Sequence, residues 1–145
     1  MQKVDIYIDG SCSGNPGPGG FAAVCPINGK LLAACGHVPQ STNNQAELRA
    51  AIKALTALKV PCEVTLCTDS QYLVTCWNHD KESLTNIKRV NHELWFEFIE
   101  AAEKGRHVVK FVKIKGHSGN KYNEIADRLA KAECAKERHL LCGGA

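Results

Sequence analysis

The chain has 145 residues, of which 44% are hydrophobic and 23% charged, as expected for one globular domain with a buried core. Its formal net charge of +3 permits a polyanionic partner without requiring one. The sequence shows neither a secretory signal nor an apolar run as long as a membrane span. We therefore expect a cytoplasmic protein with no membrane segment.

Eight cysteines are scattered along the chain without short paired spacings. Zinc sites commonly use close pairs such as Cys-x-x-Cys, so this pattern does not predict one. Without a secretory signal, buried free thiols are a better prediction than a disulfide framework. A single bridge that involves Cys142 remains an alternative.

The first third of the chain predicts an antiparallel meander. Three segments alternate or are apolar in the manner of strands, namely residues 4–9, 21–26 and 30–37. Residues 10–20, rich in glycine, serine and proline, predict a long turn. The pair Asn28-Gly29 is a strong hairpin signal between the second and third strands.

The rest of the chain alternates between helices and strands. Thr42 and Gln45 have the spacing of a capping box, which predicts a helix from near Asn43. The following predicted elements are a strand over 64–68, a helix over 70–77, a helix over 91–104, a strand over 107–115 and a helix over 123–136. Residues 78–88 are polar and show no clear pattern.

This order of elements predicts one α/β domain over residues 1–136, with a five-stranded mixed sheet flanked by helices. Three strands would be antiparallel, and two parallel strands would follow. Residues 137–145, which end in Gly143-Gly144-Ala145, are predicted to be a flexible tail.

Four carboxylates stand at places where a fold seldom puts charge. Asp9 and Asp69 each follow a predicted strand, and parallel neighbours would bring both to one edge of the sheet. Glu47 is expected in the first turn of one helix, and Asp127 lies inside another. Acids gathered in this way must bind a cation or change their pKa values, because like charges repel.

Each acid taken singly has an ordinary explanation. Asp69 precedes a predicted helix and suits a cap, while Glu47 in a first helical turn would suit the macrodipole. A surface ion pair with Arg128 or Lys131 would explain Asp127. The joint pattern is what favours a metal site.

Two loops add candidates. His117 lies in a polar loop between glycines, which favours a proton carrier near neutral pH, although a solvated histidine without a role is as good an explanation. The glycine-rich turn lacks both GxxxxGK[ST] and a GxGxxG that opens a helix. It allows either a close approach by a nucleic-acid backbone or a tight turn, and spacing does not separate the two.

Five segments together resemble type 1 ribonuclease H, in the order and spacing of that family. They are DGSCSGNPG from Asp9, TNNQAEL from Thr42, TDSQY from Thr68, KGHSG from Lys115 and NEIAD from Asn123. The resemblance implies a ribonuclease H-like fold and endonucleolytic hydrolysis of the RNA strand of an RNA–DNA hybrid. It also implies two Mg²⁺ ions bound with the substrate, with Mn²⁺ as a possible substitute, in a monomer.

The resemblance assigns roles by position. Asp9, Glu47, Asp69 and Asp127 correspond to the four acidic metal ligands, and His117 to a loop histidine that assists proton transfer or product release. Glu47 also corresponds to the acid that senses the 2′-hydroxyl at the cut site. The residues implied to bind the hybrid are Gly10, Cys12, Asn15, Thr42, Asn43, Asn44 and Gln71.

One departure concerns the segment between Tyr72 and Asn91, which is shorter than in relatives with a basic protrusion. It sets Lys81, Lys88 and Arg89 against Asp80 and Glu82. We expect a weaker grip on the DNA strand.

The main alternative function is a nucleic-acid binder that does not cut. It is disfavoured because such a binder has no use for four clustered acids. A different nuclease or a transferase of the same fold is another alternative.

Overall fold

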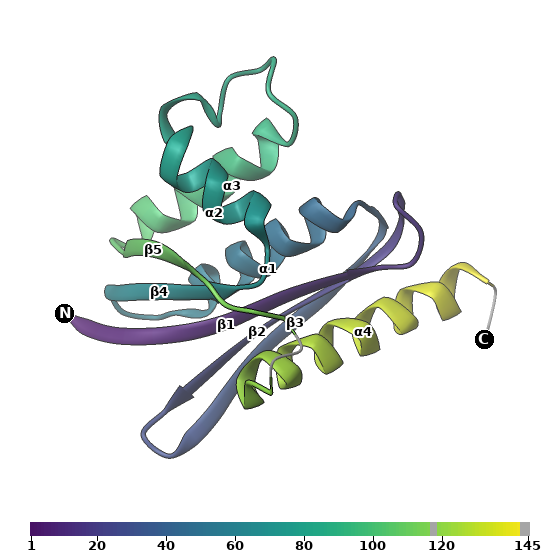
Figure 1. The fold of residues 1–145 in the computed structure, drawn as a ribbon, viewed down its shortest axis with the longest axis horizontal. Coiled ribbons are helices and arrows are strands. Elements are labelled where there is room, and N and C mark those ends of the chain that lie inside the picture. Colours follow the sequence, from purple (N-terminus) through teal and green to yellow (C-terminus); the bar gives the residue numbers. More distant parts are fainter. Residues whose placement is uncertain (117–118, 143–145) are drawn as a thin grey trace.

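The computed structural model describes residues 1–116 and 119–142 and has one mixed sheet with helices on both faces (Figure 1). The strands are β1 (Gln2–Cys12), β2 (Gly17–Ile27), β3 (Lys30–Ser41), β4 (Cys62–Thr68) and β5 (Val108–Lys113). The helices are α1 (Asn43–Ala57), α2 (Gln71–His79), α3 (His92–Lys104) and α4 (Lys121–Leu141), and a 3₁₀ turn, η1, covers Lys81–Ser83.

The sheet has the order β3-β2-β1-β4-β5. The first three strands pair antiparallel, whereas β4 pairs parallel with both β1 and β5, which confirms the predicted five-stranded mixed sheet. In the parallel register Tyr7 lies opposite Cys67. The carboxyl ends of β1 and β4 therefore meet at one edge, where Asp9 and Asp69 stand.

Helix α1 forms because its start is capped and one face is apolar. Thr42 and Gln45 make the reciprocal hydrogen bonds of a capping box, as predicted. Leu48 and Leu55 of α1 are fully buried in the core. Burying a leucine side chain contributes about 1.5–3 kcal/mol, so packing on the sheet stabilises α1 more than its cap does.

The helices divide between the two faces of the sheet. Helices α1, α2 and α3 lie on one side and α4 crosses the other, against β1, β2 and β3 (Figure 1). Helix α4 comes close to β2 at Gly20, where a Cβ would lie 2.3 Å from the Ala130 oxygen and the Cys134 nitrogen. This glycine of the predicted turn therefore belongs to β2 and serves internal packing.

The final helix is longer than the sequence suggested. Helix α4 begins at Lys121 and ends at Leu141, so residues 137–141 of the predicted flexible tail are helical. Glu137 is buried, and its Oε2 lies 2.5 Å from Nδ1 of His37 on β3. The sequence missed this extension because the contact joins residues a hundred positions apart. None of the helices in the described part of the chain is long and apolar enough to cross a membrane.

Candidate active site

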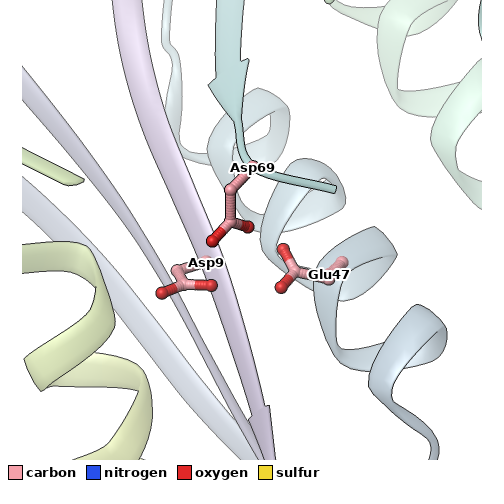
Figure 2. A group of neighbouring side chains, drawn as sticks. All are labelled: Asp9, Glu47 and Asp69. Carbon is pink, nitrogen blue, oxygen red and sulfur yellow. The ribbon is translucent and has the colours of Figure 1, made fainter. Parts of the chain in front are cut away.

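Three of the four predicted acids converge at the carboxyl edge of the sheet. Asp9 comes from β1, Glu47 from α1, and Asp69 directly follows β4. One carboxylate oxygen from each lies within 4.8 Å of the other two. Figure 2 shows the three side chains pointing toward a common space.

Glycines let the surrounding backbone come this close. A Cβ at Gly10 would lie 2.5 Å from the carbonyl carbon of Ala46 and the amide nitrogen of Glu47. A Cβ at Gly116 would lie 2.7 Å from Oδ2 of Asp69. A side chain at Gly10 would push α1 away from β1, so this glycine helps to set the distance between Asp9 and Glu47.

Glu47 lies deeper in its helix than the sequence suggested. It is the fifth residue of α1, and the first turn of that helix contains no acid, so the macrodipole explanation for this residue is wrong. Its Oε2 is buried and has no hydrogen-bond partner among the residues that the structure describes. A buried, unpaired carboxylate oxygen is unfavourable unless a cation or a donor reaches it.

Asp127 approaches the cluster from α4, on the other face of the sheet. It is close enough to Asp9 for its charge to contribute to the raised pKa of that residue. Its Oδ2 also lies 3.1 Å from Nζ of Lys131, one helical turn further on. The predicted ion pair with Lys131 therefore exists, together with the predicted proximity to the acids.

The cluster is electrostatically unfavourable without a counter-ion. Burial, followed by the charges of Asp69 and Asp127, raises the pKa of Asp9 to about 7 from an ordinary 3.8, although a hydrogen bond with Glu47 opposes the change. Burial and then the charge of Asp9 raise the pKa of Glu47 well above 4.5. At neutral pH these groups would bind either protons or a cation.

The donor set fits a hard divalent cation. Mg²⁺ prefers carboxylate and phosphate oxygens and keeps some of its waters, so a few acids suffice to hold it. Asp9, Glu47 and Asp69 offer oxygens at suitable mutual distances, and the unpaired Oε2 of Glu47 faces no competing partner within the described residues.

The residues implied to bind a hybrid lie around this edge. Asn15, in the β1–β2 turn, accepts a hydrogen bond through Oδ1 from the backbone nitrogen of Asn43, at 3.0 Å. Asn43 and Asn44 are exposed in the first turn of α1, and Thr42 is its cap. The turn and the start of α1 therefore form one surface of exposed amide groups.

Cys12 and Gln71 differ in accessibility. The thiol of Cys12 points at backbone oxygens, 3.2 Å from that of Ser41, so it fastens β1 to the end of β3. Gln71 is exposed at the start of α2, where its Nε2 donates to Thr75 and its Oε1 accepts from Lys113. His117 lies outside the residues that the structure describes.

A hydrogen-bonded network beside this surface was missed from the sequence. The hydroxyl of Tyr72 accepts from Nδ2 of Asn91 at 3.0 Å and from Nε1 of Trp95 at 3.1 Å. Oδ1 of Asn91 in turn accepts from Gln45, the capping-box residue of α1. Asn91 has φ 65°, which asparagine tolerates better than most residues, and an asparagine just before a helix was the available signal.

A cluster of acids that could hold a cation, on a mixed α/β sheet and next to exposed amides, is typical of metal-dependent phosphodiester hydrolases. The profile of the RNase H family matches residues 1–135. Ribonuclease H of Caldanaerobacter subterraneus subsp. tengcongensis is 42% identical, with 93% of each chain covered. Ribonuclease HI of Helicobacter pylori is 45% identical over 94% of this chain and 96% of its own.

Solved structures agree with these relatives. LC9-RNase H1, a type 1 RNase H with the type 2 active-site motif, has a TM-score of 0.79 at 26% identity, covering 94% of this chain and 74% of its own. LC11-RNase H1 in complex with an RNA/DNA hybrid has a TM-score of 0.71 at 27% identity, covering 92% and 97%. This chain belongs to the type 1 ribonuclease H family. It is a metal-dependent endonuclease that cleaves the RNA of RNA–DNA hybrids.

Proposed function

We propose that two Mg²⁺ ions bind among Asp9, Glu47, Asp69 and Asp127 when the hybrid is bound, with Mn²⁺ able to replace them. The observation that carries this proposal is the convergence of three acids within 4.8 Å, with an unpaired buried oxygen on Glu47. When bound, a pair of such ions activates water and stabilises the leaving oxygen in an in-line displacement.

In this proposal the acids have different tasks. Asp9 is buried at the centre, within reach of Asp69, Glu47 and Asp127, so it would contact both ions. Glu47 would also accept a hydrogen bond from the 2′-hydroxyl at the cut site, a group that RNA has and DNA lacks. His117 would carry a proton to or from the reacting phosphate, or help product release.

The exposed amides beside the acids suit a minor groove. Asn43, Asn44 and Gln71 offer donors and acceptors, which can contact base edges and 2′-hydroxyls of a wide groove. The same proposal places Gly10, Cys12, Asn15 and Thr42 at the hybrid surface. For Cys12 we expect contact through its backbone, because its thiol points at protein carbonyls.

The segment between α2 and α3 supports a weak grip on the DNA strand. Arg89 donates to Asp80 at 3.0 Å, and Nζ of Lys81 lies 4.3 Å from the centre of the Trp77 ring. Two of the three cations in this segment therefore already have partners inside the chain.

We also propose a monomeric enzyme in the cytoplasm. All four acids come from one chain, so the site requires no partner subunit. The eight cysteines are free thiols, which suits a reducing compartment.

Cleavage assays test the proposal directly. Labelled RNA–DNA hybrid, duplex RNA and duplex DNA are incubated with the protein, with Mg²⁺ or with EDTA. We expect cutting of the hybrid alone and only with the metal. Asp9→Asn should abolish turnover, while Asp5→Asn, which removes an exposed carboxylate from the same strand, should retain it. Cutting of duplex DNA, or an active Asp9→Asn variant, would overturn the assignment.

A further inference from the structure

The ammonium group of Lys131 lies next to the carboxylate of Asp127. Nζ of Lys131 lies 3.1 Å from its Oδ2, and the two residues are one turn apart on α4. The side chains of Lys131 and Asp127 are 62% and 26% exposed, so the ion pair is in contact with solvent and able to open. The contact occupies an oxygen that the proposed function assigns to metal binding.

The other three acids form a more complete site. Asp9, Glu47 and Asp69 each place an oxygen within 4.8 Å of the others. Asp127 does not belong to that close group, although it lies near enough to Asp9 to act on its charge. If the four acids are the ligands, as in the proposed function, they would offer two cation positions, one bounded by the close group and the other between Asp9 and Asp127.

We propose that Lys131 makes these two positions unequal: the position inside the close group fills first, and the one beside Asp127 fills only when Lys131 gives way. The inference rests on the proposed function, because it takes the four acids as ligands. Lys131 is thus a positioning residue that acts through Asp127. Its ammonium competes with a divalent ion for one carboxylate oxygen and repels that ion.

The size of the effect follows from Coulomb's law. A single and a double charge ~6 Å apart in water repel by an amount that changes a binding constant about tenfold, and salt screening reduces this to about threefold. Removing the charge of Lys131 should therefore tighten the second ion by about three- to tenfold. The first ion lies further away and should change by less than about twofold.

Titration of the free protein with Mn²⁺, followed by electron paramagnetic resonance, measures both constants without any turnover. Lys131→Gln is compared with Arg128→Gln, which removes the same charge from an exposed residue next to Asp127. We expect the second ion to bind more tightly in Lys131→Gln than in Arg128→Gln or the wild type.

A double-mutant cycle completes the test. Asp127→Asn should remove the second ion and keep the first, and adding Lys131→Gln should then change the remaining constant by less than about twofold. A pair that merely stabilised the helix would change the melting temperature of Lys131→Gln and leave both Mn²⁺ constants alone, which would overturn the inference. If the wild type binds no Mn²⁺ even after the hybrid is added, the proposed function is overturned instead.

Discussion

We expect the acidic cluster to make the metal-free protein less stable at neutral pH, and the substitution Asp9→Asn isolates that effect. Asp9 is only 5% exposed, and the pKa of its carboxyl is raised from 3.8 to about 7. One pKa unit corresponds to about 1.4 kcal/mol, so keeping this group ionised costs at most about 4 kcal/mol. Because neighbouring acids share protons and the site relaxes, we expect Asp9→Asn to raise the free energy of unfolding by about 1–3 kcal/mol at pH 8 in EDTA.

The stability that Asp9→Asn gains over the wild type must depend on pH. The raised pKa means that folded protein holds the Asp9 proton more tightly than the unfolded chain does. The resulting stability is fully present below pH 3.8 and is lost as the pH rises through about 7. The advantage of Asp9→Asn should therefore be largest at pH 8 and shrink as the pH falls toward 4.

Urea unfolding followed by circular dichroism measures this difference. The wild type, Asp9→Asn and the control Asp5→Asn are compared at pH 8 and pH 5, each with EDTA and with Mg²⁺. Mg²⁺ should stabilise the wild type far more than Asp9→Asn, because the ion replaces the missing proton. The reasoning fails if Asp9→Asn is equally stable relative to the wild type at both pH values, or if Asp5→Asn gives the same gain.

Three further predictions concern packing, acid stability and substrate binding. Gly20→Ala should lower the free energy of unfolding by about 1–3 kcal/mol in a melt, because the new methyl group would meet backbone atoms of α4 at 2.3 Å; an unchanged melt would contradict the packing. His107 is buried, which lowers its pKa from 6.5, so it stabilises the fold above that pH and this contribution is lost as the pH falls. The free energy of unfolding of His107→Gln should accordingly fall less than that of the wild type between pH 7 and pH 5. An equal fall would refute this prediction. The affinity for the hybrid should fall only slightly as the salt concentration rises. A slope of log binding constant against log salt concentration steeper than about −5 would contradict the weak grip proposed for the segment between α2 and α3.

Local patterns predicted most elements. The capping box of Thr42 and Gln45 fixed the start of α1, and alternation located the strands, because both signals depend on residues a few positions apart. Element ends were less accurate: β1 and β2 extend into the glycine-rich segment 10–20, where pairing across the sheet overrides the turn signal.

The sequence predicted the kind of chemistry at the site, but it did not predict how the side chains are arranged there. The order and spacing of the five segments indicated the family, and that needed no coordinates. The sequence left open whether Asp127 was an ion-pair residue or a member of the cluster, and the structure shows contact with Lys131 as well as proximity to Asp9. The sequence could not indicate the chain of hydrogen bonds from Tyr72 through Asn91 to Gln45, because these residues belong to three separate helical segments.

The sequence by itself indicated the family of this chain. The acids at strand ends, the helix cap and the spaced motifs are each recognisable within a short segment. Tertiary structure alone decided how buried Asp9 is, how close α1 and α4 come to it, and which cation stands beside Asp127. Those properties are sums over neighbours that are distant in sequence, and both charge–charge energy and desolvation depend on distances that only the folded chain sets.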